Sequence, residues 1–70
     1  MEIVYTHHAR NKIEKRKIYM TLVEETIKWP NYTRRVEQNK FIATRKLNGR
    51  SIEVVYIKEK NIKVITVYWI

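Results

Sequence analysis

The sequence contains no cysteine and no aspartate, and only one glycine and one proline. Without cysteine, neither a disulfide framework nor a thiolate metal site is possible. Without aspartate, and with no grouped set of glutamates and histidines, the carboxylate cluster of a two-metal nuclease is not expected. We therefore expect no metal and no cofactor.

Long hydrophobic runs are also missing. No apolar stretch approaches the roughly 20 residues that cross a bilayer, and no signal-like apolar segment follows Met1. We expect a soluble cytoplasmic protein with no membrane partner. The 70 residues suffice for one domain, residues 1–70, and a composition with 44% hydrophobic residues can build a core.

Basic charge is what the sequence has in excess. Lys and Arg number 15 against seven glutamates, which gives a net charge of +8. Such an excess repels itself in a compact chain and favours a polyanionic partner. A thermophilic or AT-rich genome is the alternative explanation, but it accounts for Lys and Glu together and not for twice as many cations as anions.

The start of the chain predicts a short strand followed by a helix. Residues 2–5 form the strand, and Thr6 caps a helix over His7–Lys15. The inward face of this helix carries Ala9 and Ile13.

A second helix, over residues 19 or 21 to 28, follows a break at 16–18. Thr21 and Glu24 have the spacing of a capping box, which predicts the start of this helix. Pro30 ends it, because the residue before a proline is pushed out of helical geometry. Its inward face carries residues at helical spacing: Leu22, Val23, Thr26 and Ile27.

From residue 32 onward, β-branched and aromatic residues dominate and the hydrophobic period shortens toward two. The candidate strands are Tyr32–Glu37, Lys40–Leu47, Arg50–Lys58 and Asn61–Trp69. Asn48-Gly49 predicts a two-residue hairpin with a type I′ turn, since that turn requires positive φ at both positions.

The predicted hairpin assigns residues to two faces of the sheet, because residues opposite each other share a face. Leu47 then lies opposite Arg50. The first face carries Phe41, Ala43, Arg45, Arg50, Ile52, Val54 and Tyr56. The second carries Lys40, Ile42, Thr44, Lys46, Ser51, Glu53, Val55 and Ile57. In the last strand we expect Ile65, Val67 and Trp69 on the first face, and Val64, Thr66 and Tyr68 on the second.

The predicted fold is α+β. It is a curved antiparallel sheet of three to four strands, with two N-terminal helices packed on the more apolar first face. The second face is then half open and carries polar and cationic groups. A curved sheet with such an open side can cradle a nucleic-acid backbone.

Several short motifs follow one another along the chain: His8-Ala9, Arg16 and Ile18, Trp29-Pro30, Asn48-Gly49-Arg50, Val54-Val55-Tyr56 and Ile65-Thr66-Val67-Tyr68. Their order and spacing resemble a short, largely uncharacterised branch of the RelE/ParE toxin superfamily, nearer to the BrnT toxins than to RelE itself. The resemblance covers almost the whole chain and implies a RelE-like βααβββ layout, in agreement with the fold predicted from the residues.

The resemblance also implies an activity. RelE-type toxins are metal-independent endoribonucleases that cleave mRNA, often on the ribosome, and are neutralised by a bound antitoxin. RNA is then the expected partner, with an antitoxin protein as a second one. Some members of the superfamily inhibit gyrase instead.

Metal-free RNA cleavage needs a base for the 2′-OH, cations that stabilise the phosphate, and an acid for the leaving 5′-oxygen. Our catalytic candidates are His8, Lys46, Arg50, Glu53 and Tyr68. An unperturbed imidazole titrates near neutral pH, so His8 suits acid or base chemistry, although an ordinary surface residue in a first helical turn is an equally open interpretation. Lys46 is either a phosphate clamp or a solvated strand residue, and Tyr68 either contacts RNA or packs on the sheet. Arg50 flanks the turn and can contact a phosphate bidentately.

Glu53 departs from the family pattern. Many RelE-type toxins carry an arginine at the matching position, three residues before the tyrosine that corresponds to Tyr56, and this arginine contacts the scissile phosphate. A glutamate there repels phosphate unless it serves as the base or pairs with Lys46.

Further basic residues are expected to attract phosphates without sequence specificity. They are Arg16, Arg34, Arg35, Lys40, Arg45 and Lys63. For Arg16, which lies between the predicted helices, a bond to a glutamate or a backbone carbonyl is the alternative role. For the others the alternative is a solvated surface.

Three hypotheses therefore remain open. The first is an RNA-cleaving toxin of the RelE type. The second is a non-catalytic RNA-binding module on the same fold, which Glu53 favours. The third is a protein-interaction domain for an acidic partner.

Overall fold

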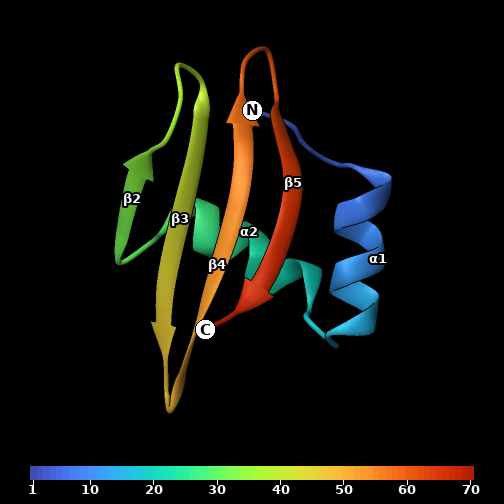
Figure 1. Ribbon diagram of the computed structural model, residues 1–70, viewed down its shortest axis with the longest axis vertical. Helices are drawn as coiled ribbons and strands as arrows, with labels where there is room; N and C mark the ends of the chain where they lie inside the picture. Colours follow the sequence, from blue (N-terminus) through green and yellow to red (C-terminus); the bar gives the residue numbers. More distant parts are fainter.

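The computed structural model describes all 70 residues and is an α+β fold of two helices and one sheet (Figure 1). Its elements are β1 (Ile3–Tyr5), α1 (His7–Lys15), α2 (Met20–Lys28), β2 (Tyr32–Arg35), β3 (Lys40–Leu47), β4 (Arg50–Lys58) and β5 (Ile62–Trp69). The predicted bounds of α1, β3 and β4 are confirmed, whereas β2 ends two residues earlier than predicted and β1 and β5 each begin one residue later. Neither helix is long and apolar enough to cross a membrane.

The sheet is larger and less regular than predicted. It has five strands in the order β1-β5-β4-β3-β2, so the prediction of three to four strands is wrong. It is also mixed rather than antiparallel, because β1 runs parallel to β5 with Ile3 opposite Ile62 and Tyr5 opposite Val64. Parallel neighbours need a long connection, and here both helices and three strands lie between β1 and β5 along the chain.

Helix α1 has the predicted cap at its start and an unusual one at its end. Thr6 Oγ1 accepts a hydrogen bond from the Ala9 N–H at 3.0 Å. At the other end the Ile18 N–H bonds to the Ile13 carbonyl at 2.9 Å, and Lys17 adopts a left-handed φ of 54°. This is the Schellman arrangement, in which that position is usually glycine. It accounts for the predicted break at 16–18.

Helix α2 starts differently from the prediction. Its N-cap is Tyr19, which makes no side-chain capping bond, so the predicted capping box of Thr21 and Glu24 is wrong. The inward face is confirmed: Val23 and Thr26 are fully buried, and Leu22 and Ile27 pack against the core.

The hairpin between β3 and β4 has the predicted register, with Leu47 opposite Arg50 and every pair from there to Lys40 and Ile57 in place. The predicted type I′ turn is wrong, because Gly49 has a φ of 86° but Asn48 is not among the residues with positive φ. A turn with positive φ at its second central position only still favours glycine there.

The pairing of β4 with β5 contains a β-bulge. Val55 faces Thr66 and the next residue, Tyr56, faces Val64, so Ile65 is an extra residue in β5. The predicted positions of Ile65 and Val64 are therefore wrong: Val64 lies on the helix side and is fully buried. The hydroxyl of Thr6 donates to the Ile65 carbonyl at 3.2 Å and thereby ties the start of α1 to the bulge.

Both helices cover the same side of the sheet, which we call the helix face. In the core on this face, Ala9 and Ile13 of α1 and Val23 of α2 pack against buried residues of the strands. These strand residues are Ala43, Ile52, Val54, Tyr56, Val64 and Val67. We call the opposite side of the sheet the open face, because no helix packs on it (Figure 1).

Candidate functional site

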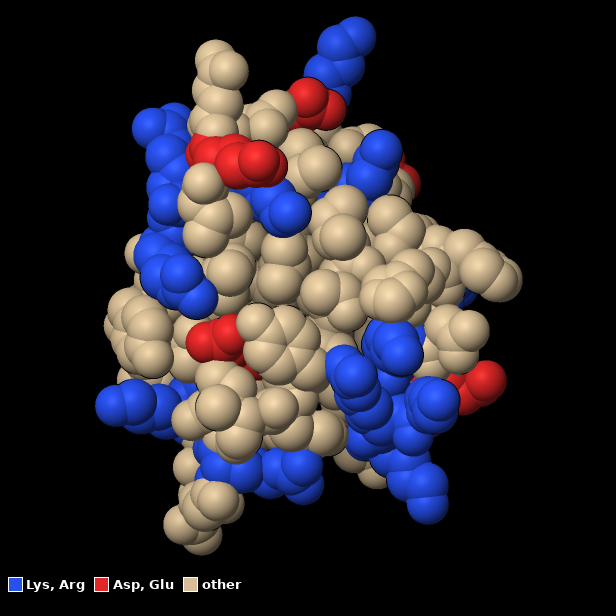
Figure 2. Space-filling model, viewed as in Figure 1, with Lys and Arg blue, Asp and Glu red and all other residues tan.

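The open face is built from alternate residues of β2, β3, β4 and β5. The strand pairing places these residues on it: Tyr32, Arg34, Lys40, Ile42, Thr44, Lys46, Ser51, Glu53, Val55, Ile57, Lys63, Thr66 and Tyr68. In Figure 1 α2 lies behind the sheet, so Figure 2 shows the open face. Its mostly tan centre is interrupted by one red group, and blue side chains surround it.

A hydrogen-bonded row crosses the middle of this face. The pairing aligns Tyr32, Thr44, Glu53 and Tyr68 across four strands. The Tyr68 hydroxyl donates to Glu53 Oε1 at 2.6 Å, and the Thr44 hydroxyl donates to Glu53 Oε2 at 3.1 Å. Each oxygen of the carboxylate thus receives one bond from the protein.

The environment of Tyr68 keeps its phenol protonated. The hydrogen bond to Glu53 raises the pKa of Tyr68 above its usual value; burial and the negative charge of Glu53 act in the same direction, while Arg34 opposes them. Each carboxylate oxygen has a second lone pair, so Glu53 can still accept a bond or a proton from a ligand. The pair therefore presents a carboxylate that can accept a further hydrogen bond, next to a phenol that keeps its proton.

Four basic residues stand around this row on the open face. Arg34, Lys40, Lys46 and Lys63 share the face by register. None of their side chains makes a hydrogen bond or an aromatic contact within the protein. Their charges are therefore free to meet an external anion.

Apolar residues fill part of the space between the polar row and the lysines. Ile42 and Ile57 are half-buried, and Val55 is only 7% exposed although no helix covers it. The open face is thus a shallow platform with an apolar centre, one polar row and a basic border.

Three arginines on the helix side have partners in the protein. Arg16 Nη1 donates to the Val67 carbonyl at 2.7 Å, and the indole of Trp69 donates back to the Arg16 carbonyl at 3.2 Å. The Arg50 guanidinium lies 3.7 Å from the centre of the Trp69 ring. Arg45 Nη1 donates to the Trp29 carbonyl at 2.9 Å.

The five predicted catalytic residues do not meet at one place. Glu53 and Tyr68 are hydrogen-bonded, and Lys46 shares their face. Arg50 lies on the helix face, where it stacks on Trp69. His8 is exposed in the first turn of α1. In Figure 1 α1 begins beside the upper right of the sheet, whereas β3, which carries Lys46 near its end, finishes at the lower left.

The predicted binding residues divide between the two sides. Arg34, Lys40 and Lys63 lie on the open face, as described above. Arg16, Arg35 and Arg45 lie on the helix side, and Arg35 packs 5.7 Å from the centre of the Phe41 ring.

Two residues of the open face were missed from the sequence. Thr44 fixes the second oxygen of Glu53, and its place opposite Glu53 was already contained in the hairpin register. Tyr32 ends the same row and is half exposed. Its position could not be predicted, because no turn signal fixed the register between β2 and β3. No three His or Glu side chains are grouped so as to hold a metal ion.

Comparison with known families gives one match. A family model described as a domain of unknown function, DUF4258, matches residues 5–69. The chain belongs to the DUF4258 family. The matched range includes both helices and all strands but the first part of β1. No curated protein and no solved structure is significantly similar to the chain. The DUF4258 description names no activity, so the resemblance to RelE/ParE toxins stays a prediction.

Proposed function

We propose that this protein binds single-stranded RNA, and that the open face contacts the RNA backbone. One observation carries the proposal. The four basic side chains of the open face have no partner within the protein, whereas Arg16 and Arg45 on the helix side donate hydrogen bonds to backbone carbonyls. With a net charge of +8, phosphate contacts supply the sequence-independent part of such binding.

The tyrosines of the polar row suit the same ligand. Tyr32 and Tyr68 stand at its two ends, separated by Thr44 and Glu53. Aromatic side chains stack on unpaired bases, and this contact tolerates any sequence because every base has a π-face. Glu53 lies between them, so bases rather than phosphates are expected over the middle of the row.

A second candidate is a metal-independent endoribonuclease of the RelE type, held in check by an antitoxin. The Glu53–Tyr68 pair favours it. A carboxylate and a phenol, with their oxygens 2.6 Å apart, are the kinds of group that can act as the base for the 2′-OH and the acid for the leaving group. Lys46 on the same face supplies a cation. The layout of two helices on one side of an otherwise uncovered sheet also agrees with the resemblance, whereas the fifth strand and the parallel edge depart from it.

Binding and cleavage are tested together with purified protein, labelled single-stranded RNA and EDTA. We expect binding that weakens with salt. For the Arg34→Gln/Lys46→Gln variant we expect the slope of log K against log salt to fall by about 1.4, since each lost phosphate contact on a single strand accounts for roughly 0.7. RNA that stays intact supports the binding module, while EDTA-resistant cleavage that Glu53→Gln or Tyr68→Phe abolishes supports the toxin.

The matched control is Lys15→Gln/Lys17→Gln, which removes the same charge from exposed positions at the end of α1. If this control weakens binding as much as the open-face variant, the open face is not the interface. If the unaltered protein binds no RNA at low salt but binds an acidic polypeptide, the proposal is overturned in favour of a protein-interaction domain. The cleavage arm includes translating ribosomes, because RelE-type toxins often act there.

A further inference from the structure

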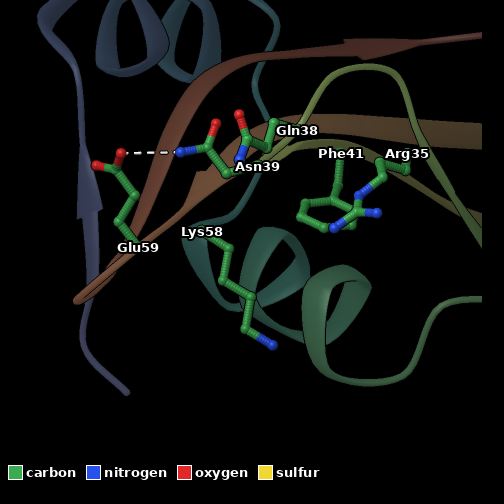
Figure 3. Close-up of a pocket in the computed structure, with 6 residues that line it drawn as sticks. All are labelled: Arg35, Gln38, Asn39, Phe41, Lys58 and Glu59. Carbon is green, nitrogen blue, oxygen red and sulfur yellow. Dashed lines mark hydrogen bonds between the residues drawn. The ribbon is translucent and has the colours of Figure 1, made fainter.

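A hollow of about 560 Å³ lies at one end of the sheet, between the loop that joins β2 to β3 and the loop that joins β4 to β5 (Figure 3). The residues that line it are Arg35, Gln38, Asn39, Phe41, Lys58 and Glu59. Arg35 pairs with Phe41, which shares the helix face with Tyr56. The hollow therefore opens on the side of the sheet opposite to the candidate site.

Arg35 is held in place while its N–H groups remain available. Its guanidinium lies over the Phe41 ring at 5.7 Å from the ring centre, as Figure 3 shows, and Phe41 in turn stacks on Tyr56 with ring centres 5.6 Å apart. Neither Arg35 nor the second cation, Lys58, makes a side-chain hydrogen bond within the protein. A guanidinium fixed by stacking can receive a phosphate bidentately with little loss of side-chain freedom.

The one carboxylate of the hollow is engaged by a neighbour. Glu59 Oε2 accepts a bond from Asn39 Nδ2 at 2.8 Å. In Figure 3 the Glu59 carboxylate and the Lys58 ammonium extend in different directions, so the cation is not neutralised by its chain neighbour. The Gln38 amide adds a neutral donor. Two cations and an amide donor around an open hollow suit a phosphate group.

Strand β2 connects this hollow to the open face. It forms one edge of the sheet, and its consecutive residues Arg34 and Arg35 point to opposite faces, since Arg34 pairs with Ile42 and Arg35 with Phe41. Both are exposed. A polyanion on the open face thus meets cations on both sides of the same edge.

We infer that the hollow binds a phosphate group of the RNA strand that lies on the open face, and that this strand passes around the β2 edge between Arg34 and Arg35. The inference rests on the proposed function, because it extends the same RNA path to a second contact site. It predicts that a long RNA makes contacts that a short RNA, held by the open face alone, does not make.

The test compares a tetranucleotide with a dodecanucleotide by fluorescence anisotropy over a range of salt concentrations. For Arg35→Gln/Lys58→Gln, the slope of log K against log salt should fall by about 1.4 with the dodecanucleotide, at roughly 0.7 for each phosphate contact, and stay unchanged with the tetranucleotide. Arg34→Gln/Lys46→Gln should lower both slopes. Lys58→Gln alone, which leaves the stack on Phe41 intact, should give about half the effect of the double variant.

The outcomes separate this inference from the proposed function. If the hollow variant behaves with both RNAs like the Lys15→Gln/Lys17→Gln control while the open-face variant lowers both slopes, the hollow is not on the path and the open face remains the interface. If the open-face variant also matches the control, both proposals fail. Amide NMR spectra of the protein, recorded with adenosine monophosphate and with the dodecanucleotide, distinguish a free nucleotide from RNA. Adenosine monophosphate that shifts Gln38 and Asn39 as strongly as the dodecanucleotide does would overturn the RNA path in favour of a free nucleotide site.

Discussion

The two faces of the sheet both carry basic residues, but these residues have different surroundings. On the helix side, Arg16 and Arg45 bond to backbone carbonyls, and Arg50 stacks on Trp69. On the open face the basic residues lack such partners: Arg34, Lys40, Lys46 and Lys63. Net charge alone therefore does not locate a binding surface. Cations that are already bonded or stacked within the protein must first be distinguished from those that are not.

The apolar residues of the two faces differ in the same way. On the helix face Ile52 and Val54 are fully buried under the helices, whereas Ile42 and Ile57 on the open face keep part of their surface in solvent. The helix face therefore holds most of the stability of the chain, and the open face can change its side chains at smaller cost.

The largest expected effect tests this division of stability. Ile52→Ala should lower the free energy of unfolding by about 2–5 kcal/mol, because it leaves a cavity in a fully buried site. Ile42→Ala, its matched change on the open face, should cost less, about 1–2 kcal/mol, since part of its side chain is already exposed to solvent. Urea unfolding followed by circular dichroism measures both.

The comparison of Ile52→Ala with Ile42→Ala has one fallback variant and one contradicting outcome. If Ile52→Ala is unfolded in buffer, Ile52→Val, at about 0.5–1.5 kcal/mol, keeps the measurement accessible. An equal loss for Ile42→Ala and Ile52→Ala would mean that the open face is covered in solution, and a dependence of the loss on protein concentration would assign the cover to a second copy of the chain.

The next effect separates a partnered cation from an unpartnered one. Arg16→Met keeps the apolar stem but removes the hydrogen bond to the Val67 carbonyl, so it should destabilise the fold by about 1.5–3 kcal/mol. Lys46→Met should change stability by less than about 0.5 kcal/mol and should weaken RNA binding. Thermal unfolding and RNA titration of both variants provide the check. If Arg16→Met weakens RNA binding without destabilising the fold, the proposed contrast between Arg16 and Lys46 is wrong.

The sequence predicted the central hairpin well because one local signal fixes it. Asn48-Gly49 sets the register of β3 against β4, so the faces of Ala43 and Val54 were confirmed residue by residue. The same register put Lys46 and Glu53 on one face. No comparable signal fixes β5, where Val64 and Ile65 are both β-branched and apolar, and periodicity alone does not indicate which of them the bulge places inward.

The positions of β1 and α1 were beyond sequence reasoning for a different reason. Three residues of strand carry no register information, and the parallel pairing of β1 depends on β5, almost sixty residues later in the chain. The helical period of α1 predicted which side faces inward, with Ala9 and Ile13, but not which part of the sheet it covers. For this reason the sequence could not show that His8, in the first turn of α1, lies apart from the open face.

A smaller effect is expected from the one carboxylate of the open face. Glu53→Gln should tighten RNA binding, by up to about fivefold if its repulsion resembles a surface charge pair of roughly 1 kcal/mol. It should also lower the pKa of Tyr68, because the hydrogen bond to Glu53 is the largest cause of the upward shift. RNA titration and the ¹³Cζ resonance of Tyr68 report the two changes.

Glu25→Gln is the matched control, since it removes the same charge from an exposed position on α2. It should leave the pKa of Tyr68 unchanged and alter RNA affinity less than Glu53→Gln does. Weaker RNA binding by Glu53→Gln would contradict the repulsion and would favour a direct role of the carboxylate in contacting or cleaving RNA.

An effect that is absent near neutral pH distinguishes the causes of tyrosine pKa shifts on the two faces. On the helix side burial is the main cause: it raises the pKa of Tyr56, and together with Glu24 it raises the pKa of Tyr5 to about 12. Folded Tyr5 thus keeps a proton that the unfolded chain loses near pH 10, so stability should fall as pH rises from about 10 to 12. Tyr5→Phe should flatten this fall in urea unfolding across that range, whereas Glu53→Gln, which acts on Tyr68, should leave most of it. An equal slope for Tyr5→Phe and the unaltered chain would show that the Tyr5 phenol is not the group whose titration destabilises the helix side.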